Sequence, residues 1–351
     1  MEVIVKALNN PEILELFTPV VFGNPSILAD TLSRLRIEDF AYNVIARAIE
    51  AEDGVINVVA VGADVTATPG VPSPEGGKAA VEALQMATDA IDKGEIDLLV
   101  TAPIDKHTAQ SDKFKFPGHT EYLEDRFVVE GGKAMMIMVA GGLRVALVTT
   151  HIPVSEVAPA ITKEKVAESI RAFNRALKMD FGSERPKMAV LSLNPHCGDS
   201  GTLGREEIEQ IVPAIEECKK EGIMALGPVA ADGLFGSGSY RHYDGILAMY
   251  HDQGLAPFKA LAGSEGVNFT AGLDIIRTSP AHGTAYDKAG RGTADETSLR
   301  QAIYEAIDIA RRRDSYLEAS ENPLPIRVAQ PRGPKKGKEK TEEEDLTVTE
   351  E

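Results

Sequence analysis

Residues 143–151 read LRVALVTTH, a run of apolar and β-branched residues that ends at a histidine. Short runs of this composition are typical of buried β-strands. Further runs of the same kind predict strands at 19–22, 55–61, 97–101, 187–193 and 243–249. A strand-like stretch also covers 267–276, and Arg277 closes it.

Segments with apolar residues at three- and four-residue spacing lie between these runs and predict helices. The predicted helices cover 78–92, 163–179, 205–220 and 298–312. Gly182, Gly222 and Gly227 stand where we expect helices to stop. Because strands that alternate with helices form parallel sheets, we predict an α/β fold with mainly parallel sheets.

Length and composition limit the classes of protein to consider. A chain of 351 residues exceeds what one hydrophobic core usually serves, so we expect two domains. Residues 333–351 are highly charged with almost nothing to bury, and this tail is predicted to be disordered. The net charge of −17 disfavours nucleic acid and anionic membranes as partners.

The predicted location is the cytoplasm. No apolar run reaches the length of a membrane span, and the first residues lack the pattern of a secretory signal. The two cysteines, Cys197 and Cys218, have no CxxC spacing, which favours a reducing compartment.

Four of the predicted strands lead to residues that can take part in chemistry. They end at or shortly before Lys106, His151, His196 and His251. The ligand crevice of an open α/β sheet lies outside the carboxyl ends of its strands, so we expect these side chains to converge. Three imidazoles suit a divalent cation such as Zn²⁺, Mn²⁺ or Co²⁺. On the pattern alone, three hydrogen-bonded loop histidines are an equally good interpretation.

Other polar signals are weaker. Residues 282–295 read HGTAYDKAGRGTAD, a glycine-rich turn whose backbone amides could face a nucleotide, although a plain loop is the default interpretation. Neither a GxGxxG fingerprint nor a P-loop is present. Lys259, Asn268 and Arg277 could bind a phosphate or carboxylate.

Several motifs resemble those of the 4-hydroxythreonine-4-phosphate dehydrogenase family of pyridoxal phosphate biosynthesis. The resemblance covers roughly residues 2–325, with AMYHDQGL and LNPH as its most specific pieces. The matching segments are LNPH at 193–196, AMYHDQGL at 248–255, RTS at 277–279, HGTA at 282–285, TAPIDK at 101–106 and GHTE at 118–121.

The resemblance implies a set of functional residues. The implied metal ligands are His151, His196 and His251. The implied substrate contacts are His119, Thr120, Lys259, Asn268 and Arg277. The implied cofactor contacts near the adenosine half are His282, Gly283, Thr284 and Asp287. Lys106 and Asp252 are the two candidates for the proton acceptor.

The resemblance also implies an architecture and an assembly. The family shares the two-domain fold of isocitrate and isopropylmalate dehydrogenases, and it works as a homodimer with the site at the interface. We therefore expect a discontinuous cofactor-binding domain over 1–113 and 253–328. Residues 114–252 are expected to form the domain for metal, substrate and dimerisation.

Two departures from the family pattern are visible. Family members open with a strand and a loop resembling GDPAGIGPE, whereas this chain begins at what corresponds to the final glutamate, Glu2. We therefore expect a core strand and a loop that lines the site to be missing. Ala281 stands where the family usually has aspartate.

The function implied is oxidation and decarboxylation of 4-phosphohydroxy-L-threonine to 3-amino-2-oxopropyl phosphate. It would use NAD, with NADP as the alternative, and a divalent metal such as Zn, Co, Mn or Mg. A sister dehydrogenase of erythronate or threonate 4-phosphate is the nearest alternative. An acyltransferase resembling phosphate acetyltransferase and a non-catalytic phosphate-ligand binding protein are the alternatives from other classes.

Overall fold

The computed structural model of the chain describes residues 1–62, 64–112, 114–129 and 132–323. The tail at 333–351 that the sequence predicts to be disordered lies outside these residues. None of the helices in the described ranges is both long and apolar enough to cross a membrane.

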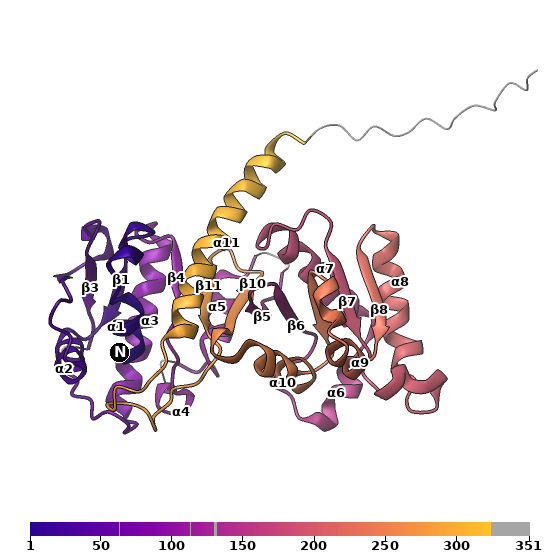
Figure 1. The fold of residues 1–351 in the computed structure, drawn as a ribbon, viewed down its shortest axis with the longest axis horizontal. Coiled ribbons are helices and arrows are strands. Elements are labelled where there is room, and N and C mark those ends of the chain that lie inside the picture. The colour runs from indigo at the N-terminus through magenta and orange to yellow at the C-terminus, as the bar shows by residue number, and fades with distance from the viewer. Residues whose placement is uncertain (63, 113, 130–131, 324–351) are drawn as a thin grey trace, which may run out of the picture.

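Eleven strands in the described residues form two sheets (Figure 1). The small sheet has the order β1-β3-β2, and the large sheet has the order β4-β11-β10-β5-β6-β9-β7-β8. The strands are β1 (Val20–Gly23), β2 (Tyr42–Ile45), β3 (Ile56–Ala60), β4 (Leu98–Val100), β5 (Met135–Ala140), β6 (Leu143–Leu147), β7 (Lys187–Leu191), β8 (Met224–Val229), β9 (Gly245–Ala248), β10 (Val267–Ala271) and β11 (Ile276–Pro280).

Helices cover the faces of both sheets (Figure 1). They are α1 (Glu2–Leu8), α2 (Pro25–Leu35), α3 (Pro74–Asp92), α4 (Lys106–Ala109), α5 (His119–Phe127), α6 (Val154–Ala160), α7 (Lys163–Met179), α8 (Val212–Lys220), α9 (Ala231–Gly236), α10 (His251–Ala262) and α11 (Thr297–Glu321). A π-helical turn over Glu207–Ile211 leads into α8. The expected α/β fold with mainly parallel sheets is confirmed.

Helix α7 illustrates why the predicted helices form where they do. The side chain of Thr162 accepts a hydrogen bond from the backbone N–H of Lys165 and so caps the first turn. Val166, Ile170 and Phe173 recur at helical spacing and are fully buried against the large sheet. The helix therefore has the bounds that its apolar periodicity predicts.

Two local predictions are wrong. The expected single strand over 267–276 is two antiparallel strands, because the chain reverses at Gly272, whose φ of +83° suits glycine. Gly182 and Gly222 do follow helices, but Gly227 lies inside β8 instead of at a helix end.

The large sheet changes direction in its middle. The neighbours β11/β10, β10/β5 and β5/β6 pair antiparallel, whereas β4/β11 and the strands from β6 to β8 pair in parallel. Three reversals separate β4 from β6, so β4 does not run with the strands that precede the histidines. The expectation of one shared carboxyl edge is therefore correct for β6, β7 and β9 and wrong for β4.

The large sheet also crosses the predicted domain boundary, since β4, β10 and β11 belong to one predicted domain and β5 to β9 to the other. The domain division stays a prediction. Strands β1 and β4 are the outer strands of their sheets, and both line one groove with a volume of about 780 Å³. Thr101 and His119 lie at its wall.

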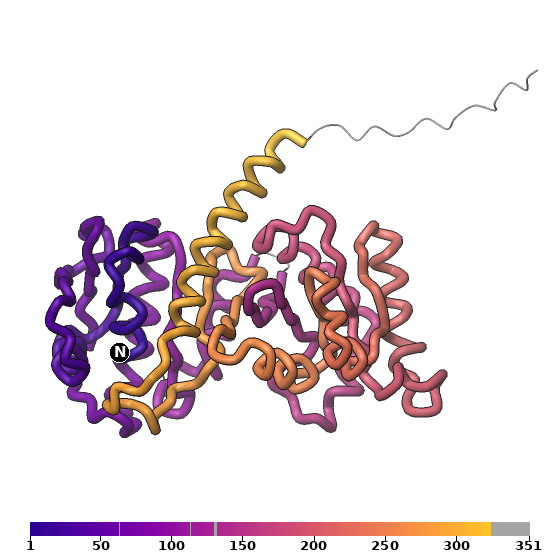
Figure 2. Tube along the Cα trace, in the orientation of Figure 1, coloured from indigo at the N-terminus to yellow at the C-terminus, as the bar shows by residue number. Residues whose placement is uncertain are grey.

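The start of the chain packs against its later part (Figure 2). The Lys6 ammonium donates to the carbonyls of Gly292 and Ala294 at 2.8 and 2.7 Å, and Glu2 accepts from the backbone N–H of Ala294 at 2.9 Å. Helix α1 is thereby tied to the loop that precedes α11.

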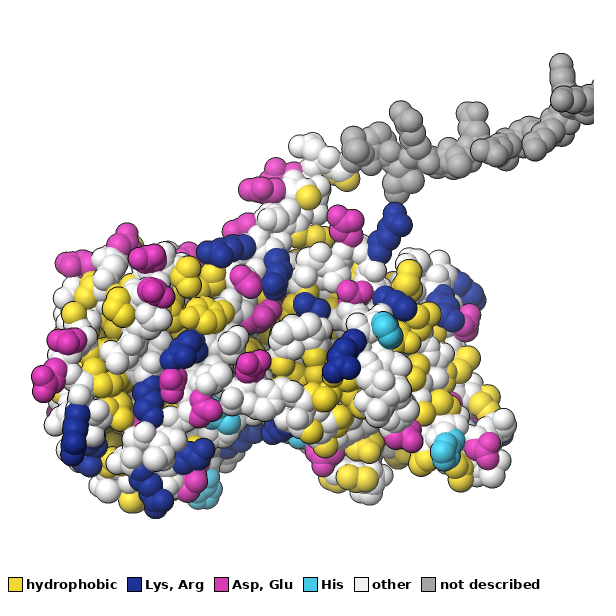
Figure 3. Space-filling view, viewed as in Figure 1, with side chains coloured by type: hydrophobic (Ala, Val, Ile, Leu, Met, Phe, Trp, Pro, Cys, Tyr) yellow, Lys and Arg dark blue, Asp and Glu magenta, His cyan; other side chains and the backbone are white. Residues whose placement is uncertain are grey.

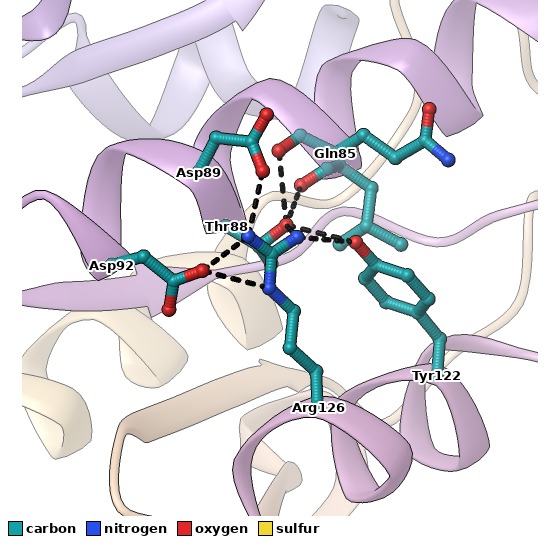
Figure 4. Close-up of polar contacts among 7 residues, drawn as sticks. Gln85, Thr88, Asp89, Asp92, Tyr122 and Arg126 are labelled. Atoms are coloured by element: carbon teal, nitrogen blue, oxygen red, sulfur yellow. Dashed lines mark hydrogen bonds and ion pairs between the residues drawn. The ribbon is translucent and has the colours of Figure 1, made fainter.

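A polar network joins α3 to α5 (Figure 4). The Arg126 guanidinium donates to Asp89 at 2.6 Å, to Thr88 and Tyr122 at 2.9 Å each, and to Asp92. Thr88 and Tyr122 also share a hydrogen bond of 3.0 Å. This network holds α5, and with it His119, against the rest of the fold.

Candidate active site

Three of the predicted site residues follow neighbouring strands. β6, β9 and β7 lie next to one another in parallel, so their carboxyl ends meet at one edge of the sheet. The rings of His151 and His251 lie 5.9 Å apart, centroid to centroid. Burial and the positive charge of Lys106 lower the pKa of His151, which favours the neutral imidazole that a metal requires.

His196 lies in an unusual turn after β7. Five consecutive residues of this turn have positive φ. The angle is between 43° and 56° at His196, Cys197, Asp199 and Ser200, and it is 78° at Gly198. Such a left-handed run is strained for residues other than glycine. Among the described residues, no three His, Cys, Asp or Glu side chains are grouped closely enough to hold a metal ion. The single chain thus brings His151 and His251 together without completing a three-ligand group.

Asp252 lies against His251. Its carboxylate is 2.7 Å from Nδ1 of that imidazole, and the Asp252 side chain is 85% exposed. A carboxylate in this position holds the Nδ1–H tautomer and leaves Nε2 available to a ligand. This contact favours an orienting role for Asp252 over that of proton acceptor.

Arg277 is a buried cation that has no ion-pair partner among the described residues. Its guanidinium donates to Thr101 Oγ1 at 2.7 and 3.1 Å and to Thr270 Oγ1 at 3.1 Å. Burial lowers the pKa of Arg277 to about 10, and the negative charge of Glu121 opposes that change. A buried guanidinium held by two neutral hydroxyls is a seat for an anion.

His119 contacts this cation, and Asn268 lies two residues before Thr270 on β10. Arg277 donates to Nδ1 of His119 at 3.4 Å, and burial together with the charges of Arg277 and Lys106 lowers the pKa of His119 to about 3. The Asn268 side-chain oxygen is buried without a hydrogen-bond partner within the described ranges. Thr120 follows His119 in the first turn of α5. Two of the five predicted substrate contacts, Arg277 and His119, are therefore in direct contact.

Lys106 comes close to two groups of residues, the pair His151 and His251 and the seat at Arg277. It does so even though β4 runs opposite to β6, β7 and β9. It begins α4, capped by Asp105, and its charge acts on His119 and on His151. The connection from Thr101 to α4, and not the shared edge of the sheet, therefore brings Lys106 to the site. In Figure 3, most of the histidine side chains that show lie in the lower half of the face drawn, and one lies higher in its right half.

A second cavity, with a volume of about 580 Å³, contains most of the predicted cofactor residues. Its lining includes His282, Gly283 and Thr284 but not Asp287. Lys259, predicted to contact substrate, also lines this cavity. The volume falls within the usual range for sites that bind small molecules and cofactors.

The sequence did not reveal several residues that shape these sites. Thr101 and Thr270 hold Arg277, yet threonines in strands carry no signal of such a role. Ionisable side chains from distant segments also line the cavity, and no spacing connects them before folding: Glu2, Asp30, Arg34, Lys288 and Asp295.

The fold and the two sites together define a class of protein: an α/β protein with a buried cationic seat, adjacent histidines and a separate cavity of cofactor size. The family model described as "Pyridoxal phosphate biosynthetic protein PdxA" matches residues 15–306. The chain belongs to this family.

Individual relatives agree with this assignment. A 4-hydroxythreonine-4-phosphate dehydrogenase of Bacteroides thetaiotaomicron is 54% identical over 324 residues, which cover 92% of this chain and 88% of the relative. A "Putative D-threonate 4-phosphate dehydrogenase" of Cutibacterium acnes is 37% identical, with 91% of this chain and 94% of the relative covered. The solved 4-hydroxythreonine-4-phosphate dehydrogenase of Klebsiella pneumoniae superimposes with a TM-score of 0.76 at 31% identity, covering 88% of this chain and 93% of that one. The expectation of an oxidoreductase is confirmed.

Proposed function

We propose that this chain oxidises 4-phosphohydroxy-L-threonine with NAD and releases CO₂. The observation that carries the proposal is the seat at Arg277, where a buried cation lies against His119. On the neighbouring strand β10, the side-chain oxygen of Asn268 is buried and has no hydrogen-bond partner among the described residues. A phosphate would supply the negative charge that this seat lacks. The carboxylate of Glu121 is too weak a counter-charge to prevent a lowered pKa of Arg277.

The proposed reaction has two steps. Hydride leaves C3 of the substrate for the nicotinamide while the C3 hydroxyl loses its proton, which gives a β-keto acid and NADH. The carboxylate then leaves as CO₂, and C2 takes up a proton to give 3-amino-2-oxopropyl phosphate.

The residues present fit a divalent metal in part. His151 and His251 would hold it through neutral imidazoles, with Asp252 orienting His251. When bound, such a metal would act as a Lewis acid on the oxygen at C3. Of the two candidates for the proton acceptor, Lys106 is close to both groups, whereas Asp252 is hydrogen-bonded to His251; in this role Lys106 would act as the neutral amine, after loss of its own proton.

We propose that a homodimer completes the site, with His196 supplied across the interface. The absence of a three-ligand group within the described part of one chain supports this arrangement. The cavity lined by His282, Gly283, Thr284 and Lys259 would hold the cofactor. Its mixture of acidic and basic side chains does not select NAD or NADP.

The second candidate is the oxidation of a threonate 4-phosphate. The 37% identity to the relative from Cutibacterium acnes favours it, because both substrates present a phosphate and a neighbouring hydroxyl. Membership in this family favours either dehydrogenase over the acyltransferase alternative.

The experiment that tests the proposal is an assay of NADH formation on a panel of 4-phosphorylated hydroxy acids, with and without added Zn²⁺, Co²⁺, Mn²⁺ or Mg²⁺. We expect fastest turnover with 4-phosphohydroxy-L-threonine and loss of turnover on chelation. Faster turnover of threonate 4-phosphate would favour the second candidate. Cofactor binding without turnover of any substrate would favour a binding protein.

A further inference from the structure

Hydrogen bonds connect the three loops that carry the histidines. At the end of β6, the Thr149 hydroxyl donates to the carbonyl of Met249 at 2.7 Å, and the Thr149 backbone N–H donates to the same oxygen at 3.1 Å. Met249 lies two residues before His251, and Thr149 lies two residues before His151. The backbones that lead to these two histidines are therefore joined directly.

Gln253 makes the next connection. Its side-chain oxygen accepts from the backbone N–H of Met249 at 2.7 Å, and its side-chain nitrogen donates to the carbonyl of Ser192 at 2.6 Å. One amide thus spans from the start of α10 to the end of β7. It links the loop that carries His251 to the loop that carries His196.

Glu207 holds the His196 loop from its other side. Its carboxylate accepts from the backbone N–H groups of Leu193 and Asn194 at 2.8 and 2.7 Å, and from Asn194 Nδ2 at 3.0 Å. Glu207 is 2% exposed, and a buried carboxylate requires such donors. Asn194 is two residues before His196, so these bonds determine the direction in which the chain enters the strained turn.

The left-handed turn needs this support. Four residues other than glycine have positive φ there, a conformation that is unfavourable for residues with a Cβ. Strain of this kind persists where the surroundings determine the backbone conformation. A Cβ at Gly198 would lie 2.7 Å from the Glu207 carboxylate, so the turn packs directly on that side chain.

We propose that Gln253 and Glu207 are positioning residues: Gln253 fixes the backbone that leads to His251 against the end of β7, and Glu207 fixes the backbone that leads to His196. The inference rests on the proposed function, in which these histidines bind a divalent metal. Neither side chain reaches the site itself, and each acts through the backbone that precedes a histidine.

The test variants are Gln253→Met and Glu207→Gln. Gln253→Met keeps the length of the side chain and removes both of its hydrogen bonds. Glu207→Gln keeps the shape and turns an NH₂ group toward the Nδ2 donor of Asn194. The matched controls are Gln210→Met, which removes a bond to the backbone N–H of Lys163, and Glu209→Gln, which removes an exposed pair with Arg205.

Titration of each full-length protein with Co²⁺, followed by the absorbance of the bound ion, is the main measurement. We expect both test variants to bind Co²⁺ about 10–100-fold more weakly, with an altered absorption spectrum, as happens when partners of metal ligands are lost. Both controls should bind Co²⁺ with an affinity within about twofold of that of the unchanged protein. Thermal unfolding shows whether Gln210→Met destabilises the fold as much as Gln253→Met does.

Co²⁺ affinity and spectrum unchanged in both test variants would overturn the inference. If the unchanged protein binds no Co²⁺, the metal in the proposed function is wrong. The positioning role is then decided by the imidazole NMR signals of His196 and His251. Imidazole signals that shift in the test variants and not in the controls support the positioning role. Unshifted imidazole signals in the test variants overturn it.

Discussion

At the scale of single residues, the site depends on two side chains whose pKa the fold lowers. Arg277 stays charged although it is buried, and His119 beside it stays neutral because it is buried and because a proton there would face Arg277 and Lys106. Arg277 and His119 thus form an anion seat that carries one positive charge and not two adjacent ones.

Arg277→Lys tests this seat. The lysine ammonium cannot reproduce the planar set of donors that reaches Thr101, Thr270 and an anion together. We expect the KM for the phosphorylated substrate to rise about tenfold or more, with a smaller change in kcat. Steady-state kinetics measure both, and the control is Arg171→Lys, at an arginine that pairs with Glu217 and Glu221 away from the site. Equal KM values for Arg277→Lys and the unchanged protein would place the phosphate elsewhere.

The pH dependence of stability tests the neutral state of His119. Its pKa is about 3 in the folded chain and 6.5 when unperturbed, so below pH 6.5 the unfolded chain binds a proton that the folded chain refuses. The free energy of unfolding should therefore fall as the pH falls through this range.

His119→Asn removes this titration. Urea unfolding at pH 7 and pH 5 should show the unchanged protein losing about 1–2 kcal/mol more than the variant. An equal loss in both proteins would mean that His119 becomes protonated in the folded state.

At the scale of elements, polar side chains decide how helices and strands meet. Arg126 on α5 reaches two carboxylates and a hydroxyl of α3, and it crosses 34 to 38 residues of sequence to do so. Because α5 begins at His119, the position of this helix also determines one side of the anion seat.

We expect Arg126→Ala to lower the free energy of unfolding by about 1–2 kcal/mol, since several charge-assisted bonds and the packing of the arginine stem are lost together. Arg34→Ala is the comparison, because its pair with Asp30 is exposed within one helix and should contribute much less to stability. Denaturant unfolding measures both variants. Similar losses in the two would show that the network adds nothing beyond a surface ion pair.

At the scale of the whole molecule, the site lies at the junction of segments far apart in the chain, and the described part of one chain brings no three metal-binding side chains together. His151 and His251 lie together, whereas His196 follows a different turn. A two-fold dimer brings the same surface of each subunit together, so both sites would be completed at once.

Mixing inactive variants tests the dimer. If His196 comes from the partner, a mixed dimer of His151→Ala and His196→Ala contains one intact site, and the re-equilibrated mixture should recover up to about a quarter of the full activity. A mixture of His151→Ala and His251→Ala should recover none. Recovery in neither mixture, or a fully active monomer in sedimentation, would contradict the shared site.

Local patterns in the sequence determined the strands before His151, His196 and His251, and the bounds of α7, because burial of alternate or helically spaced side chains is a property of neighbouring residues. The same patterns, with the resemblance to a family, identified the residues of the anion seat. The roles of those residues stay proposals, as does the metal.

Tertiary structure alone decided the rest. The reversal of the sheet between β4 and β6 depends on which strands pair, and no local pattern records that choice. Thr101 meets Arg277 across 176 residues, and Gln253 meets Ser192 across 61. Strands pair through backbone groups that every residue has, so the sequence of one strand does not specify which strand lies beside it. The packing of the whole core selects the neighbours, and these contacts follow from that selection.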